Sequence, residues 1–267
     1  GAHAEIRLAG LTYAEAEPTF SKVEYELDRL ENLFSLYRAD STLMRLNAEG
    51  RLDAPPPEML ELLSLAGSVH DRTGGLFDPT VQPLFALYAD RAVEGRLPTA
   101  AELAGAYTLV GFDGVDFSRD HIAFAHPGMA LTLNGIAQGF ITDRIAALLR
   151  EAGLRDMLVD IGEIRAIGNR PSGGGWHVTL SDGSRVVLKD RAIASSNRLG
   201  TLVNPAAGIG HIFDPRSGAA PVTGPALTVN AQHSSAAVAD AYATAATLTA
   251  QSTVRDWQTE GLTFSWS

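Results

Sequence analysis

Hydrophobic positions in residues 1–107 recur mainly at the spacing of amphipathic helices, after a short alternating strand at 3–9. Between 15 and 34 the apolar side chains share one helical face: Phe20, Val23, Leu27, Leu30 and Phe34. A helix beginning at Pro57 and ending near Thr73-Gly74-Gly75 is predicted by a second apolar set: Met59, Leu62, Leu63, Ala66 and Val69. Another helix runs through Leu84 and Tyr88. Asp40-Ser41 can cap a short helix, and Thr99 with Glu102 matches a capping box.

Alternating and short apolar runs predict strands over much of the remaining chain. The segment 108–133 has the pattern of hairpin strands, and a strand bent at Gly162-Glu163 covers 157–167. Three closely spaced strands at 176–180, 185–190 and 192–196 are expected to form one antiparallel sheet. A strand at 226–231, a small-residue helix capped at Ser234-Ser235 and an alternating tail follow. We therefore predict an α+β fold of mixed, largely antiparallel sheets with packed helices, in a single domain over residues 1–267.

One stretch, residues 131–168, combines a strand, a tight turn and a helix. Leu131 to Leu133 suits a short buried strand, and Asn134 is a good N-cap for the helix that follows. Gly135 and Gly139 would leave the first-turn N–H groups open to an anion such as a phosphate. The same small residues could equally serve only to let the helix lie close to a sheet.

Composition and charge narrow the possible partners. The net charge is −10 and no block of Lys or Arg occurs, so the long-range field repels nucleic acid and anionic membrane surfaces. No apolar run approaches the roughly 20 residues that a membrane span needs. The chain has no Cys, so a metal would have to be held by oxygen or imidazole groups.

Asp240 and Thr244 form the clearest candidate for a metal site. They are four residues apart on the last predicted helix, so both side chains lie on one face and could reach one hard cation. Mg²⁺ prefers oxygen ligands and commonly keeps water and substrate phosphate in its shell. The alternative is structural: an Asp early in a helix favours its dipole, and a Thr among alanines can simply pack.

Three other residues have both a chemical and a structural interpretation. His211, in the loop GHIFDPRSG, could accept a proton from a hydroxyl nucleophile, or it could only form hydrogen bonds within that loop. Tyr37 could stack on a planar ring or pack beside its turn. Asp78, before Pro79, could cap the next helix or contribute a carboxylate to a site.

Taken together, the motifs resemble one family, the ApbE-type FAD:protein FMN transferases. The resemblance extends over nearly the whole chain and rests on these segments in order: YRADSTLMRLN, TGGLFDPTVQPL, LNGIAQGFITDRI, DIGEIRAIG, GHIFDPRSG and ADAYATA. Within the family, NGIAQGF with DIGEIRAIG is most similar to the NosX-type members associated with nitrous oxide respiration.

The resemblance implies an α+β architecture related to the T-fold and an enzyme that binds FAD and Mg²⁺. Such an enzyme cleaves the pyrophosphate of FAD, releases AMP and attaches FMN to a Thr or Ser hydroxyl of a protein. The acceptor would be a flavoprotein of a membrane respiratory complex, for which a NosR-like protein is one candidate. Family members of this type act in the periplasm, so a signal peptide, absent from this chain, is expected to precede Gly1.

Residue roles follow from the same resemblance. Asp240, Thr244 and a backbone oxygen near Gly135 would bind Mg²⁺, and His211 would be the base for the incoming hydroxyl. The residues implied to contact the cofactor are Tyr37, Leu76, Phe77, Asp78, Thr132, Asn134, Gln138 and Phe213.

Two positions depart from the family pattern. Members commonly have an Asp where this chain has Thr132, and Lys or Glu where it has Gln138. Losing both charges would weaken cofactor or metal binding or change the choice of acceptor. Two further functions therefore stay open: an FAD hydrolase that uses water as acceptor, and a non-catalytic flavin-binding or assembly protein.

Overall fold

A six-stranded antiparallel sheet forms the centre of the described part of the chain. The computed structural model describes residues 4–10, 12–220 and 227–266. In spatial order the strands are β1 (Glu5–Leu8), β5 (Met157–Asp160), β6 (Ile164–Ile167), β9 (Arg191–Asn197), β12 (Thr228–His233) and β13 (Thr263–Trp266). Every neighbouring pair runs antiparallel.

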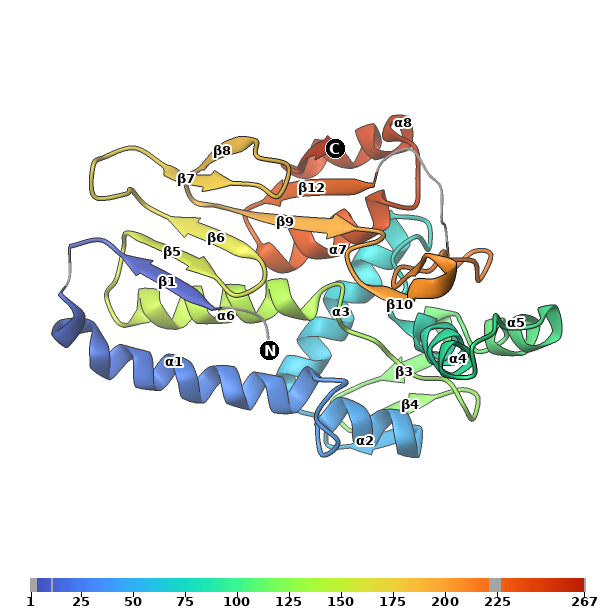
Figure 1. Cartoon of the computed structure of the whole chain (residues 1–267). Coiled ribbons are helices and arrows are strands. Elements are labelled where there is room, and N and C mark those ends of the chain that lie inside the picture. The colour runs from blue at the N-terminus through green and yellow to red at the C-terminus, as the bar shows by residue number, and fades with distance from the viewer. Residues whose placement is uncertain (1–3, 11, 221–226, 267) are drawn as a thin grey trace.

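Three helices cover one face of this sheet (Figure 1): α1 (Tyr13–Phe34), α6 (Ala137–Glu151) and α7 (Ala236–Ala246). The predicted apolar stripes form the main core between them, because Leu30, Ile145 and Leu149 are fully buried there. Phe34 of α1 meets Phe140 of α6 edge to face, with ring centroids 5.6 Å apart. No helix of the described residues has the length and apolar character needed to cross a membrane.

The opposite face of the sheet is partly covered by a hairpin of β7 (Trp176–Thr179) and β8 (Arg185–Leu188). The prediction that residues 176–196 form one sheet was wrong, because β7 and β8 pair with each other while β9 joins β6 and β12. The cause is the alternation of β7, whose Trp176 and Val178 face inward and pack in a cluster with Leu158 and Ile193 of the main sheet. The hairpin thus lies on the sheet instead of extending it.

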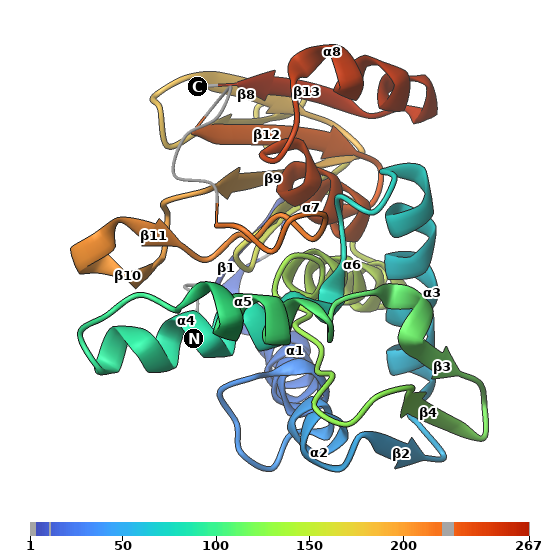
Figure 2. The ribbon, with the colours of Figure 1, turned by 90° about the vertical axis from the view of Figure 1, so that its right-hand side faces the viewer.

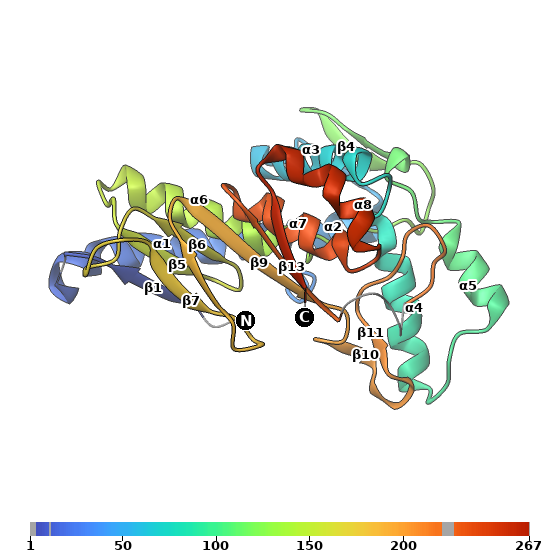
Figure 3. The ribbon, with the colours of Figure 1, turned by 90° about the horizontal axis from the view of Figure 1, so that it is seen from above.

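The remaining elements lie to one side of the sheet layer, as Figures 2 and 3 show. The helices are α2 (Thr42–Glu49), α3 (Pro57–Arg72), α4 (Gln82–Val93) and α5 (Ala100–Tyr107), with α8 (Gln251–Val254) nearer the C-terminus. Short strands form two small sheets: β2 (Arg51–Asp53), β4 (His121–Phe124) and β3 (Val115–Phe117) in one, β10 (Leu202–Asn204) and β11 (Ile209–Gly210) in the other.

Several helix starts that were predicted from capping residues close in sequence are confirmed. Ser41 accepts a hydrogen bond from the Met44 N–H at 3.0 Å, and Ser235 caps α7 through the Val238 N–H. Thr99 and Glu102 form the capping box of α5, and α3 begins at Pro57. These bonds connect residues only three positions apart, so the sequence contains all the information they need.

The segment before α6 differs from the prediction. Residues 131–133 are not part of a strand, since Leu131 pairs with the side chain of Asn47 and the Thr132 N–H donates to the Pro79 carbonyl. Asn134 is not the N-cap either, because α6 begins at Ala137 after Ile136. A side-chain amide from α2 here takes the place of a neighbouring strand.

Candidate functional site

A cavity of about 950 Å³ opens between the helical face of the sheet and the α4, β10 and β11 region. Its size is at the upper end of the roughly 300–1,000 Å³ that is usual for small-molecule sites. The residues to which the family resemblance gives a role all line it: Tyr37, Leu76, Phe77, Asp78, Thr132, Asn134, Gly135, Gln138, His211, Phe213, Asp240 and Thr244. Segments more than 200 residues apart in the chain thus meet in one place.

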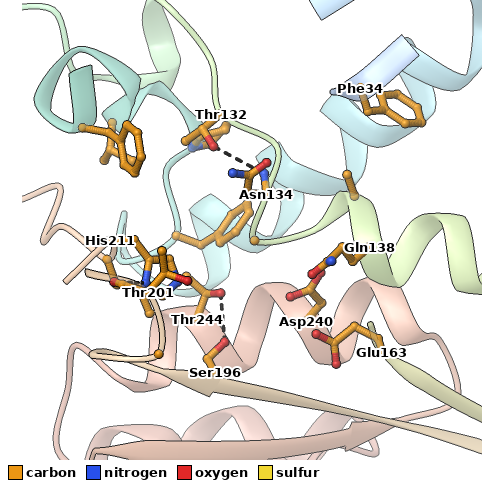
Figure 4. A pocket seen from close by; sticks show the side chains of 18 of the residues that line it. Phe34, Thr132, Asn134, Gln138, Glu163, Ser196, Thr201, His211, Asp240 and Thr244 are labelled. Carbon is orange, nitrogen blue, oxygen red and sulfur yellow. Dashed lines mark hydrogen bonds between the residues drawn. The ribbon is translucent and has the colours of Figure 1, made fainter. Parts of the chain in front are cut away.

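Within the cavity, the polar residues form two groups with a link between them (Figure 4). Gln138, Asp240 and Glu163 lie together on one side, and His211 lies beside Thr201 on the other. Thr244 and Ser196 lie between these two groups, with their hydroxyl oxygens 3.2 Å apart.

The two helices that carry the candidate metal site are in direct contact. The Gly139 N–H at the start of α6 donates to Asp240 Oδ2 of α7 at 3.2 Å. A Cβ on Gly139 would lie 2.3 Å from the Ala236 carbonyl oxygen, and one on Gly135 would lie 3.0 Å from Thr244 Oγ1. At Gly139 the clash would be with backbone, so only glycine allows this approach, and at Gly135 a side chain would crowd Thr244. Both halves of the predicted site line the same cavity. The anion expected at this helix start is supplied, for Gly139, by Asp240 itself.

Asp240 and Glu163 place two carboxyl groups side by side in the protein interior. Burial raises the pKa of Asp240, although the bond from the Gly139 N–H opposes this effect. Burial and the charge of Asp240 raise the pKa of Glu163, which accepts a hydrogen bond from the Ser195 N–H at 3.2 Å. Within the described residues, neither carboxyl group forms an ion pair with a basic side chain. A bound proton or a cation must therefore compensate the negative charge of these two carboxyl groups.

The oxygen atoms here suit a hard cation with few protein ligands. Asp240 offers a carboxylate, Thr244 a hydroxyl, and the close approach at Gly135 brings backbone to the same point. No group of three or more His, Cys, Asp or Glu that could enclose a metal occurs among the described residues. Mg²⁺ fits such a set, because it is commonly bound by one or two carboxylates and completes its shell with water and phosphate.

His211 is oriented by a contact with the backbone. Its Nδ1 lies 3.1 Å from the Thr201 carbonyl oxygen. Because a carbonyl can only accept, Nδ1 carries the hydrogen and Nε2 retains the lone pair. Burial lowers the pKa of the ring, which favours the neutral form. The arrangement leaves a proton acceptor at the cavity wall.

The loop of residues 76–78 has a mainly structural explanation in the case of Asp78. Its Oδ1 accepts from the Thr80 N–H at 2.8 Å, and Oδ2 accepts from the Phe112 N–H at 3.1 Å. Burial raises the pKa of Asp78, and these hydrogen bonds oppose the rise. Leu76 and Phe77 are buried beside it. The capping interpretation of Asp78 therefore holds, and its carboxylate is occupied.

The other aromatic and polar residues differ in how firmly they are held. Tyr37 is 83% exposed at the cavity rim, whereas Phe213 is buried against Tyr88, with ring centroids 5.1 Å apart. Thr132 Oγ1 accepts a long bond of 3.4 Å from the Asn134 N–H. Gln138 packs over Gly162, where a Cβ would lie 2.8 Å from Gln138 Nε2.

Glu163, Ser196 and Thr201 are among the lining residues that sequence reasoning did not single out. For Glu163 a signal existed, since it is the one acidic residue inside the apolar segment IGEIRAIG. Ser196 lies near the end of β9, a strand of ordinary composition. Thr201 acts through its backbone carbonyl, which every residue type has, so the sequence contained no signal for it.

Comparisons with known proteins match the chain to one family. The sequence model of the ApbE family matches residues 1–263. A FAD:protein FMN transferase of Haemophilus influenzae is 28% identical over 206 residues, 72% of this chain and 58% of the relative. One of Klebsiella pneumoniae is 25% identical over 257 residues, 90% of this chain and 73% of the relative.

The fold has a counterpart among solved structures. A mutant of the flavin transferase ApbE from Vibrio cholerae matches with a TM-score of 0.85 at 22% identity, covering 99% of this chain and 89% of that one. This likeness confirms the predicted α+β fold. The chain spans 58% of the length of the Haemophilus relative and 73% of the Klebsiella relative.

Proposed function

The chain belongs to the ApbE family, and we propose that it transfers FMN from FAD to a hydroxyl group of an acceptor protein, with release of AMP. The curated relatives that it matches are named for this activity. The observation that carries the proposal is that Gly135, Asp240, Thr244 and His211, from separate parts of the chain, line the same cavity.

Asp240, Thr244 and a backbone carbonyl near Gly135 would hold Mg²⁺ in this proposal. When bound, the ion would stabilise negative charge on the pyrophosphate. Two buried acids without a basic partner among the described residues, and a glycine that brings backbone close to Thr244, support this assignment. Thr132 and Gln138 carry no charge, so the proposed site would depend more strongly on Asp240.

His211 would act as the general base for the acceptor. Its Nε2 takes the proton of the acceptor hydroxyl, the hydroxyl oxygen bonds to the phosphorus of the FMN half, and the bond from that phosphorus to the bridging oxygen breaks. AMP leaves with the bridging oxygen. The Nδ1 contact with the Thr201 carbonyl holds the ring in the tautomer that this step requires.

The cavity walls would position the two ring systems of FAD. Phe77 and Phe213 offer buried apolar surface, and the exposed ring of Tyr37 is available for stacking at the rim. Leu76, Thr132, Asn134 and Gln138 complete the proposed contacts. Since the Asp78 carboxylate is already bonded, its contribution would be to shape this loop.

The acceptor we propose is a Thr or Ser of a flavoprotein in a membrane respiratory complex outside the cytoplasm. The motifs NGIAQGF and DIGEIRAIG support a link with nitrous oxide respiration and a NosR-like acceptor. A panel of acceptor peptides that differ only in Thr, Ser or Val at the target position tests the hydroxyl requirement, and labelling of the Val peptide would refute it.

One incubation tests the proposed function. The chain is mixed with FAD, Mg²⁺ and an acceptor peptide, and the products are separated after denaturation. We expect a covalently fluorescent peptide and an equal amount of AMP. Free FMN with AMP would instead make the chain an FAD hydrolase, and intact bound FAD would make it a flavin-binding protein.

Asp240→Ala supplies the matched negative control for this incubation. Removing the carboxylate should lower Mg²⁺-dependent turnover by about 100-fold or more, as expected when a group that holds charge in the transition state is lost. Asp240→Asn keeps an acceptor for the Gly139 N–H and removes the charge. Full activity in either variant would remove Asp240 from the site.

A further inference from the structure

Asp143 connects the two helices that form the candidate metal site, and nothing so far assigns it a role. It lies on α6, four residues after Gly139, and does not line the cavity. Figure 1 shows α6 and α7 side by side beneath the sheet. The question is what keeps Asp240 and Thr244 of α7 opposite the start of α6.

The carboxylate of Asp143 binds the N-terminus of α7. Its Oδ1 accepts from the Ala236 N–H at 2.9 Å, and its Oδ2 accepts from the Ala237 N–H at 3.2 Å. The Ser235 hydroxyl donates to Oδ2 at 2.6 Å. On its other side, Arg165 of β6 pairs with Oδ1. The carboxylate thus joins α6, α7 and the sheet.

The Ser235 hydroxyl can donate to Asp143 but cannot accept from it. A carboxylate only accepts, so the Ser235 proton must point to Asp143, and the lone pairs of the hydroxyl are left for the Val238 N–H. The donors in the first turn of α7 are therefore satisfied together by Ser235 and by a residue of another helix.

The two helices touch at two levels that are one turn apart. Asp143 holds Ala236 and Ala237, and one turn earlier on α6 the Gly139 N–H meets Asp240. A slip of α7 by one residue would rotate it by about 100° and turn the Asp240 carboxylate away from the cavity. The contact at Asp143 excludes such a slip.

We propose that Asp143 is a positioning residue that fixes the rotation and height of α7, and thereby sets the affinity of Asp240 and Thr244 for a divalent cation. This inference rests on the proposed function for the identity of the metal ligands. Loss of residues that orient metal ligands typically lowers metal affinity roughly 10- to 100-fold. A purely structural role would reduce the folded fraction and leave the affinity of folded molecules unchanged.

The test compares Asp143→Asn with the wild type and with Asp156→Asn. Asp156 also caps a backbone N–H, that of Asn169 at 2.6 Å, and does not line the cavity. Mn²⁺ serves as a paramagnetic substitute for Mg²⁺, and its binding is measured by electron paramagnetic resonance without FAD and without turnover.

We expect Asp143→Asn to weaken Mn²⁺ binding at least about tenfold, while Asp156→Asn binds like the wild type. Ser235→Ala, which removes one of the three donors from the start of α7, should shift binding in the same direction by less. AMP release by Asp143→Asn should need correspondingly more Mg²⁺ and recover at saturating Mg²⁺.

Unchanged Mn²⁺ affinity in folded Asp143→Asn would overturn the positioning role, as would an equal loss in Asp156→Asn. Failure of the wild type to release AMP would overturn the proposed function but not the positioning role. The Mn²⁺ titration would still show whether Asp143 affects metal affinity. A wild type that binds no Mn²⁺ would refute the inference outright.

Discussion

His211 combines an oriented ring with a pKa below its ordinary value. The Thr201 carbonyl fixes the tautomer, and burial disfavours the charged imidazolium. In the unfolded chain the same side chain has its ordinary pKa of about 6.5. As the pH falls below that value, the unfolded state takes up the proton first, so the free energy of unfolding contributed by His211 decreases. A neutral, oriented imidazole is therefore the dominant form at neutral pH.

The first prediction concerns this ring. The rate of transfer should rise with pH as His211 loses its proton, with a midpoint below about 6.5 because burial lowers its pKa. His211→Asn should lower the rate by about 10²–10⁴-fold. Its amide can replace Nδ1–H as the donor to the Thr201 carbonyl, so FAD affinity should stay unchanged. A pH–rate profile measures the midpoint, and a value at or above about 7 would contradict the role of His211 as the base. A fluorescence titration measures the FAD affinity of the variant.

Single residues show how far sequence reasoning reached. His211, Asp240 and Thr244 were predicted from side-chain chemistry, helical spacing and the family motifs, and all three line one cavity. The pairing of Asp240 with Glu163 was not found, because it joins positions far apart in the chain through a buried space. The sequence shows which residues have reactive side chains, whereas the neighbours that shift the pKa of those side chains depend on the fold.

At the scale of elements, close contact between α6 and α7 depends on Gly139. The second prediction is that Gly139→Ala destabilises the chain by about 1–3 kcal/mol, because the new Cβ would lie 2.3 Å from the Ala236 carbonyl oxygen and the helices would have to separate. Activity should fall with it, since Asp240 would lose its contact with α6. Urea unfolding measures the free energy change.

Gly105→Ala is the matched control for this substitution. Gly105 lies in α5, and a Cβ there would meet no atom within 4 Å. Alanine should therefore stabilise this helix by about 0.5–1 kcal/mol. Equal effects of the two substitutions would show that helix propensity, and not the α6–α7 approach, decides the outcome.

The elements also show why one prediction failed. Caps such as Ser41 and Ser235 act over three residues, so their helix starts were predicted correctly. The segment at Leu131 has an apolar pattern that suits a strand, but its backbone is bonded at 2.8 Å by both groups of the Asn47 amide, 84 residues away. An apolar pattern reports burial, and it does not report which group satisfies the backbone.

At the scale of the whole molecule, the charge of the chain opposes its proposed substrate. The net charge is −10, and Asp240 and Glu163 lie in the cavity where the pyrophosphate of FAD would bind. Both the long-range field and these two acids disfavour an anionic ligand. A divalent cation at Asp240 would reverse the local sign, so FAD and Mg²⁺ should bind cooperatively.

The third prediction measures this coupling. In His211→Asn, which should leave FAD intact, Mg²⁺ should raise FAD affinity by about 5- to 150-fold, and FAD should raise Mg²⁺ affinity by the same factor because coupling is reciprocal. Riboflavin carries no phosphate, so its affinity should not respond to Mg²⁺. Flavin fluorescence titrations with and without Mg²⁺ give both constants. If Mg²⁺ raised the affinity for riboflavin as strongly as that for FAD, the cation would act by ordering the cavity. It would then not act by reducing the repulsion between the phosphates and the buried acids.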